Sequence, residues 1–228
     1  MDISIVIPAF NAVKFIETCM NSIINQKGFN GTSILLGVDG CPETLQKSLD
    51  IRKQYPSLRI FWFEQNYGPY IVMNSLIYGL SMDNLLIFNI DDIMLQGLLA
   101  TVKQELKKHP VVRYCYQDAI GSRFVFPKTT ANGTFAIRKG IFCLLDGFRG
   151  FRIAADSDFK QRLIRAGVEI CYLKDRAYFI RCKHPDALTV RKETCPDSPF
   201  RKECKHQMQQ MVDTRVPPRV VGFKEILP

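Results

Sequence analysis

Short apolar runs and helical segments alternate along the first half of this chain, and the alternation limits the folds that it can adopt. The apolar runs have the length of buried strands, and strands that alternate with helices form βαβ units. Such units give a mostly parallel sheet with right-handed crossovers. The predicted strands are residues 3–8, 33–38, 58–63 and 85–89. The predicted helices are residues 11–26, with Asn11 as N-cap, 43–54 and 71–80.

Shorter elements follow in the second half of the chain, where the spacing of apolar residues changes more often. We expect helices at residues 95–108, 140–145, 156–166 and 201–213. We expect strands at residues 111–116, 122–126, 135–137, 168–173 and 177–181. Together these elements predict an α/β chain whose mixed, mostly parallel central sheet is flanked by helices.

Charge and cysteine content narrow the partners and the compartment. The 228 residues carry a formal net charge of +9, which favours an anionic partner such as a nucleotide, a nucleic acid or a membrane surface. No apolar run reaches the length of a membrane span, so we expect no transmembrane segment. No basic-then-apolar signal opens the chain, and its eight cysteines lie scattered without a C-x-x-C pair. We therefore expect a cytoplasmic protein with reduced thiols and no zinc site among its late Cys and His residues.

Two adjacent carboxylates, Asp91 and Asp92, follow the fourth predicted strand. Ligands of open α/β sheets bind beyond the carboxyl ends of the strands. Neighbouring carboxylates repel each other unless a cation or hydrogen-bond donors offset the charge, and a divalent ion shared with substrate phosphates would do so. Asp39 closes the second predicted strand and should project over the same sheet edge. The alternative is that Asp92 caps the following helix and Asp91 is solvated.

Two common nucleotide-binding loops are missing from the sequence. A G-x-G-x-x-G loop would follow the first strand, but Pro8-Ala9-Phe10-Asn11 occupies that turn, and no Walker A sequence occurs. A nucleotide must therefore be held by another device. A carboxylate such as Asp39 can accept from a base N–H or a ribose hydroxyl, and a second carboxylate can hold a metal ion that bridges a diphosphate.

Six short motifs, taken in order and spacing, resemble family 2 glycosyltransferases, which are inverting enzymes of the GT-A (Rossmann-like) fold. The resemblance covers about residues 2–191. The motifs are the opening strand and loop Ser4-Ile5-Val6-Ile7-Pro8-Ala9-Phe10-Asn11, the second-strand motif Val38-Asp39-Gly40, the N-x-G loop Asn66-Tyr67-Gly68 with Asn74 on the next helix, Asn89-Ile90-Asp91-Asp92 in place of D-x-D-D, Asp156-Ser157-Asp158-Phe159 in place of E-D-x-D, and the late segment Arg181-Cys182-Lys183-His184-Pro185.

The resemblance implies a function as well as a fold. It implies inverting transfer of one sugar from a nucleotide-diphosphate sugar, with a UDP-sugar favoured, to a hydroxyl of a glycan or another acceptor. Asp156 would be the general base. Mn²⁺ or Mg²⁺ would be held by Asp91, Asp92 and His184. The residues implied to bind the nucleotide sugar are Pro8, Ala9, Phe10, Asn11, Asp39, Asn66, Gly68, Asn74, Asn89 and Asp91.

The same resemblance divides the chain. Residues 1–191 would form the glycosyltransferase domain, with a nucleotide-binding half at 1–94 and an acceptor half at 95–191. Residues 192–228 would form a basic C-terminal extension that is solvated, closes over the diphosphate or contacts an anionic acceptor. Within the acceptor half, Asp158 would be structural and would bond the backbone or Arg162. Processive synthases of the family carry a Q-x-x-R-W motif and membrane helices, so their absence here predicts single additions.

Departures from the family pattern keep other functions open. Asn89 replaces the first Asp of the metal motif, Ala155 replaces the Glu before the base, and Met73 replaces an Arg. A non-catalytic protein that binds nucleotide sugars or glycans is therefore an alternative. A sugar-phosphate nucleotidylyltransferase is a further one, but it should have a glycine-rich first loop with a basic residue. A nucleic-acid-binding domain would need clustered basic residues, and those of this chain are dispersed, so we expect no nucleic-acid partner.

Overall fold

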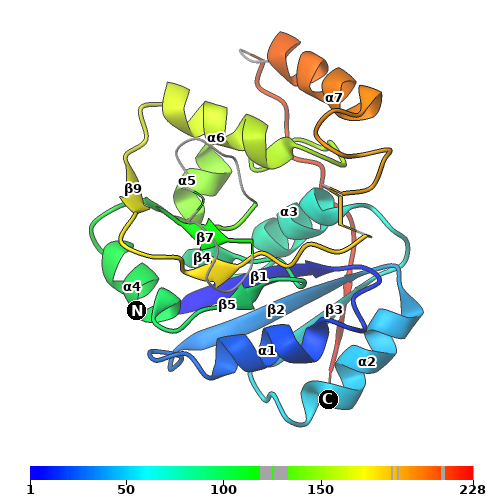
Figure 1. Cartoon of the computed structure of the whole chain (residues 1–228), viewed down its shortest axis with the longest axis vertical. Helices are drawn as coiled ribbons and strands as arrows, with labels where there is room; N and C mark the ends of the chain where they lie inside the picture. Colours follow the sequence, from blue (N-terminus) through cyan, green and yellow to red (C-terminus); the bar gives the residue numbers. More distant parts are fainter. Residues whose placement is uncertain (119–124, 126–132, 186, 189, 212–213, 228) are drawn as a thin grey trace.

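Eight strands form one open sheet that runs through the centre of the molecule (Figure 1). The computed structural model describes residues 1–118, 125, 133–185, 187–188, 190–211 and 214–227. In order across the sheet, the strands are β11 (Lys224–Ile226), β3 (Leu58–Phe63), β2 (Thr32–Asp39), β1 (Ile3–Ala9), β4 (Asn84–Ile87), β8 (Phe135–Arg138), β6 (Val111–Tyr114) and β9 (Ile170–Leu173).

The sheet is mixed, as predicted, and its strand order creates a binding crevice. The pairs β1–β2, β2–β3, β1–β4 and β6–β9 are parallel, whereas β8 runs antiparallel to β4 and β6. The chain moves outward from β1 to β2 and β3 and then returns to β4 on the other side of β1. Such a reversal opens a crevice beyond the carboxyl ends of the two strands between which it occurs, here β1 and β4.

Helices cover both faces of the sheet (Figure 1). Successive side chains of a strand point to opposite faces, so Ile5 and Ile7 enter one core while Val6 enters the other. Full burial of each such side chain contributes about 1.5–3 kcal/mol. The first core also contains residues of α1 (Ile16–Ile24), α2 (Pro42–Arg52) and α4 (Leu98–Glu105), and the second contains residues of α3 (Pro69–Gly79), α5 (Lys139–Leu144) and α6 (Ala155–Arg165).

A second, smaller sheet lies beside the crevice, and its pairing makes α4 shorter than the helix predicted for residues 95–108. Its strands are β5 (Ile93–Met94), β10 (Phe179–Ile180) and β7 (Tyr116–Gln117), in that order. Because β5 pairs with β10, and because Gly97 turns the chain at φ +89°, α4 begins at Leu98 and not at residue 95 as predicted. The predicted strand 122–126 lies outside the described residues except for Val125, which forms an antiparallel bridge with Tyr116.

The first predicted helix begins later than its apolar spacing indicates, so the prediction that Asn11 caps it was wrong. Asn11 has φ +51°, a left-handed conformation that turns the chain after β1. The next residue, Ala12, is buried, and its backbone N–H donates to Thr44 Oγ1 at 3.0 Å. These contacts hold the segment as a loop, and α1 begins only at Ile16.

The end of the chain belongs to the domain and not to a separate extension. β11 pairs antiparallel with β3 and completes one edge of the sheet. Glu225 accepts two hydrogen bonds from Arg59, at 2.7 and 2.9 Å. Phe223 packs against Phe61 and Phe63, with ring centroids 5.5 Å apart in each pair. The predicted boundary at residue 191 therefore does not separate the core from the C-terminal residues.

The remaining helix, α7 (Pro199–Gln210), packs near the start of α6, with Cys204 and Met208 against Ile153 and Ala154. All eight cysteines are free thiols. Among the described residues, no helix combines the length and the apolar character that a bilayer crossing requires.

The packing of Phe223 predicts that the last strand contributes to stability. Phe223→Ala removes a partly buried ring from between Phe61 and Phe63, so the free energy of unfolding should fall by about 2 kcal/mol, less than for a fully buried Phe. Leu227→Ala is the matched control, because Leu227 is 72% exposed and should change stability by less than about 0.5 kcal/mol. Chemical denaturation measures both. Equal stability of the two variants would contradict the assignment of this segment to the sheet.

Candidate active site

A pocket of about 650 Å³ opens at the crevice beyond β1, β2 and β4. This volume suits a small-molecule ligand. The loop after β10 and the segment before α7 also line it. The structure brings together at this pocket nearly all of the site residues predicted from the sequence, namely Pro8, Ala9, Phe10, Asn11, Asp39, Asn66, Gly68, Asn89, Asp91, Asp92, Asp156 and His184.

Asp39 ends β2 and holds the loop that follows β3. Its two carboxylate oxygens accept hydrogen bonds from the backbone N–H groups of Tyr67, at 2.7 Å, and Gly68, at 2.9 Å. Burial raises the pKa of Asp39, while these two donors and the positive charge of Arg152 act in the opposite direction. The carboxylate thus fixes the loop and still lines the pocket.

The loops after β2 and β3 approach each other closely at a glycine. Gly40 has φ +65°, and a Cβ placed there would lie 2.4 Å from the carbonyl carbon of Gln65. Only glycine fits such an approach. On the far side of this loop, the Arg152 guanidinium donates to the backbone oxygen of Asn66 at 3.2 Å and also to its side-chain oxygen. The predicted N-x-G loop is therefore held from both sides.

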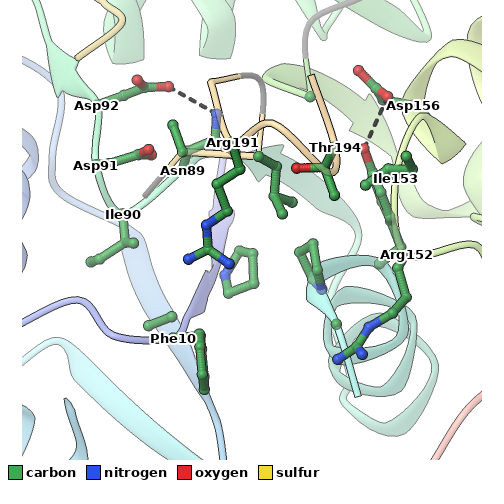
Figure 2. A pocket seen from close by; sticks show the side chains of 18 of the residues that line it. Phe10, Asn89, Ile90, Asp91, Asp92, Arg152, Ile153, Asp156, Arg191 and Thr194 are labelled. Carbon is green, nitrogen blue, oxygen red and sulfur yellow. Dashed lines mark hydrogen bonds between the residues drawn. The ribbon is translucent and has the colours of Figure 1, made fainter. Parts of the chain in front are cut away.

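Asp92 is buried, and two donors satisfy its carboxylate. The Asn89 side-chain amide donates to it at 2.8 Å (Figure 2). The Cys182 backbone N–H also donates to it, at 3.3 Å. Burial and then the neighbouring charge of Asp91 raise the pKa of Asp92 well above its usual range. Asp92 therefore joins β4 to the segment after β10, and it does not cap α4, which was the alternative considered from the sequence.

Asp91 faces a histidine from a distant part of the chain. Its Oδ2 atom lies 3.0 Å from Nε2 of His184, and their side chains are 26% and 19% exposed. The ring of Phe15 packs on the imidazole, with centroids 4.6 Å apart. The small sheet brings about this meeting, because β10 leads directly into the segment that carries His184. A carboxylate oxygen and an imidazole nitrogen at this separation can both bind one metal ion.

Asp156 lies across the pocket from Asp91, in the first turn of α6 (Figure 2). The Tyr70 hydroxyl donates to Asp156 Oδ1 at 2.9 Å. Burial and the adjacent carboxylate raise the pKa of Tyr70, so the phenol stays protonated and remains a donor. Ala154, with φ +61°, turns the chain just before the helix. A carboxylate oriented in this way can accept a proton from a bound hydroxyl group.

A buried ionic cluster anchors the helix that carries Asp156. Asp158 Oδ1 binds Arg149 at 2.9 Å, and its other oxygen binds Arg162 at 2.7 Å. The contact with Arg162 confirms the structural role predicted for Asp158. Arg149 also donates to the backbone oxygens of Met211, at 2.6 Å, and Thr214, at 2.9 Å. The cluster therefore joins α6 to the chain after α7.

Asn74 is the exception among the predicted binding residues. It is fully buried in α3 and does not line the pocket. Its amide donates to the backbone oxygens of Phe148, at 2.7 Å, and Arg219, at 3.3 Å, and its oxygen accepts from the Phe148 N–H at 3.0 Å. Its side chain holds two loops in position and does not face the pocket.

Several pocket residues were not predicted. Arg152 precedes α6. Figure 2 shows Arg191 between the wall that carries Asp91 and Asp92, called the acidic wall below, and the wall that carries Asp156. Thr194, Phe200 and Arg201 also line the pocket from the segment that was predicted to be an extension. The basic composition of that segment was the available signal, but sequence spacing alone cannot place it against the crevice.

Comparison with known proteins identifies the class. The sequence profile of glycosyl transferase family 2 matches residues 4–168, which include Asp39, Asp91, Asp92 and Asp156. The chain therefore belongs to glycosyltransferase family 2 and has its GT-A fold. His184 and the segment that contains Arg191 and Arg201 lie beyond the matched residues.

The structure resembles that of TarS from S. aureus. TarS 1-349 in complex with UDP-GlcNAc matches with a TM-score of 0.70 and 19% identity, covering 81% of this chain and 59% of that chain. A second TarS structure matches with a TM-score of 0.72 and 18% identity, covering 96% of this chain and 41% of that chain. A TarS 1-349 complex with UDP matches with a TM-score of 0.68 and 18% identity, covering 93% of this chain and 70% of that chain. The chain thus spans roughly half the length of the first two. A search of curated protein sequences finds no match.

The ionic cluster predicts a large loss of stability when its acid is removed. Asp158→Ala leaves Arg149 and Arg162 as unpaired, largely buried charges, so the free energy of unfolding should fall by about 3–5 kcal/mol. Glu17→Ala is the control, because the Glu17 side chain is 55% exposed and its ion pair with Lys47 is on the surface, so its removal should cost less than about 1 kcal/mol. Urea denaturation compares the two. A loss for Asp158→Ala no larger than that of the control would show that the cluster does not stabilise α6.

Proposed function

We propose that this chain transfers a single sugar, with inversion, from a nucleotide-diphosphate sugar to a hydroxyl group of a glycan or another acceptor. The observation that carries the proposal is the arrangement of one pocket, which has Asp156 on one wall and the Asp91–His184 pair on the other (Figure 2). Family membership supports a transferase, and the fold shared with TarS bound to UDP-GlcNAc supports a UDP-sugar as donor.

The nucleotide is proposed to lie between the ends of β1 and β2. Each carboxylate oxygen of Asp39 accepts one hydrogen bond from the loop backbone. A carboxylate can accept about four hydrogen bonds, so its remaining lone pairs can accept from a base N–H or a ribose hydroxyl. Phe10 is 45% exposed at the pocket and offers an aromatic face for stacking. Asn66 and Gly68 are held nearby by Asp39 and Arg152, which pre-organises this part of the pocket.

A divalent ion, Mn²⁺ or Mg²⁺, is proposed to bind at Asp91 and His184. The acidic wall fits such a group, because a buried carboxylate with a strongly raised pKa, Asp92, lies next to a second one. Asp92 already accepts from Asn89 and Cys182, so Asp91 is the better placed direct ligand and Asp92 orients the loop. When bound, such an ion offsets the negative charge that develops on the leaving diphosphate. Arg191 and Arg201 line the same pocket and add positive charge.

The reaction is proposed to be a direct displacement at the anomeric carbon. The acceptor oxygen forms a bond to that carbon as the bond to the diphosphate oxygen breaks, and the electron pair leaves with the nucleoside diphosphate. Asp156 takes the proton of the acceptor hydroxyl. Tyr70 holds the Asp156 carboxylate through its hydrogen bond and thereby orients it. Attack from the wall opposite the leaving group inverts the configuration.

One alternative, a non-catalytic nucleotide-sugar or glycan-binding protein, arises because Asn89 and Ala155 replace family carboxylates. The contacts of Asn89 weigh against it, since Asn89 still lines the pocket and its amide donates to Asp92 at 2.8 Å, which keeps the neighbouring carboxylates in place. The pocket keeps its candidate base and its metal-binding pair. Binding of the nucleotide sugar without any transfer to any acceptor would favour this alternative.

The base assignment predicts a loss of transfer without a loss of donor binding. Asp156→Asn should lower the transfer rate by at least about a hundredfold, because a neutral amide cannot accept the proton. Donor binding, measured by calorimetry, should stay unchanged, because the acidic wall and the nucleotide loop are intact. Asp50→Asn, at an exposed carboxylate of α2, is the control with full activity. Tyr70→Phe should slow transfer by about tenfold, the worth of roughly one hydrogen bond to a charged group. Full activity of Asp156→Asn would rule out this base.

The metal assignment predicts a pH-dependent response to manganese. UDP with Mn²⁺ should raise the melting temperature more than UDP alone does, and more than GDP, dTDP or CMP do with or without Mn²⁺. Asp91→Asn should remove the effect of Mn²⁺. Folding raises the pKa of Asp92, so protonation of this carboxylate stabilises the metal-free protein as pH falls. Protonation also removes a negative charge beside the proposed metal site and so weakens the binding of Mn²⁺. The Mn²⁺-dependent shift should therefore shrink as pH is lowered. Equal UDP binding with and without Mn²⁺ in the intact protein would contradict the assignment.

A further inference from the structure

A second group of metal-ligating side chains lies at the opposite edge of the central sheet from β11. Its members are Glu105, at the end of α4, His109, just beyond it, and Cys171, on the edge strand β9 (Figure 1). The His109 backbone N–H donates to the Glu105 carbonyl at 2.8 Å, so the helical turn continues and both side chains share one face. None of these three described residues lines the pocket.

The ligand atoms are close enough to share one ion. Glu105 Oε2 lies 3.7 Å from His109 Nε2 and 4.0 Å from Cys171 Sγ, and the three ligand atoms lie within 4.8 Å of one another. Ligands bound tetrahedrally at about 2.0–2.3 Å lie roughly 3.3–3.8 Å apart. The separations of 3.7 and 4.0 Å are close to these values, so a bound ion would need to draw the side chains only slightly together.

A fourth residue supplies an independent feature of metal sites. Nδ1 of His109 lies 2.8 Å from Glu169 Oε1, while Nε2 of the same ring faces Glu105. Histidines that bind a metal ion commonly donate their other ring N–H to a carboxylate, which fixes the tautomer and the orientation of the ring. With Nδ1 as the donor to Glu169, the lone pair of Nε2 would be on the side of the ring that faces Glu105.

The charges around Cys171 also favour a cation. The Glu105 carboxylate lies 4.0 Å from its thiol, and the Glu169 carboxylate lies 2.8 Å from the neighbouring His109 ring, so two acidic groups surround the candidate ligands. Lys108 Nζ lies 3.9 Å from Glu105 Oε1 and is well exposed. A bound divalent ion would stabilise the thiolate and offset both carboxylates at once.

We propose that Glu105, His109 and Cys171 form a binding site for a Zn²⁺-class ion, with Glu169 as the outer carboxylate that orients His109. Thiolate and imidazole ligands favour Zn²⁺ over Mn²⁺ or Mg²⁺, so this site and the oxygen-rich pocket differ in preference. The ion joins the edge strand β9 to the end of α4 and so stabilises that edge of the sheet. The proposal does not depend on the transferase activity.

Cobalt titration of the full chain tests the proposal, because Co²⁺ bound by a thiolate absorbs in the near ultraviolet and tetrahedral Co²⁺ absorbs in the visible. We expect one equivalent of Co²⁺ to give both bands, Zn²⁺ to displace it, and Zn²⁺ to raise the melting temperature. Cys171→Ser should remove the thiolate band. His109→Gln should abolish tight binding. Cys182→Ser is the control, because this thiol lies beside the pocket carboxylates and could give a band of its own.

Glu169→Gln supplies a second test that keeps all three ligands. Loss of the outer carboxylate should weaken Zn²⁺ binding about 10–100-fold, while the metal-free protein should still unfold cooperatively in urea. If Cys171→Ser or His109→Gln no longer unfolds cooperatively in urea and is therefore misfolded, Glu169→Gln decides. No thiolate band with the native chain, a band that survives Cys171→Ser but not Cys182→Ser, or unchanged Zn²⁺ affinity in Glu169→Gln would each overturn the proposal.

Discussion

The burial of Asp92 next to Asp91 is the constraint on which the rest of the site depends. A buried carboxylate needs hydrogen-bond donors, and a second negative charge beside it destabilises its ionised form further. Asn89 and the backbone of Cys182 meet it, and these contacts draw the segment after β10 onto the end of β4. That segment carries His184 to Asp91. The need to satisfy two adjacent acids thus assembles the acidic wall from residues far apart in sequence.

The opposite wall depends on the end of the chain. Asp158 and its two arginines hold α6, and Arg149 extends the same cluster to the backbone after α7. The chain then returns along Asn74 and Ser75 of α3 before β11 joins the sheet. Buried charges of this kind are costly unless every partner is present. The final segment therefore both completes the edge of the sheet and fixes the helix that carries Asp156.

Local sequence patterns predicted most of the parallel core and the acidic residues of the pocket, because strand ends and short motifs are encoded nearby in the chain. They failed where distant contacts decide. Asn11 was predicted to cap a helix, yet its left-handed turn and the contact of Ala12 with Thr44 make a loop. β11 has only three residues and depends on β3 for its pairing. Asn74 fits a binding motif, but its partners, Phe148 and Arg219, lie far along the chain.

The crevice and the β9 edge of the sheet present different chemistry because different elements meet there. At the crevice beside β1 and β4, converging strand ends place carboxylates and backbone groups around an open pocket, which suits hard ions and phosphates. At β9, an edge strand meets the end of α4, so a strand thiol lies beside helix carboxylate and imidazole groups. Softer ions prefer the second set. β8 and β6 separate β9 from β4, so the two sets of side chains lie at different places on the sheet and differ in ligand type.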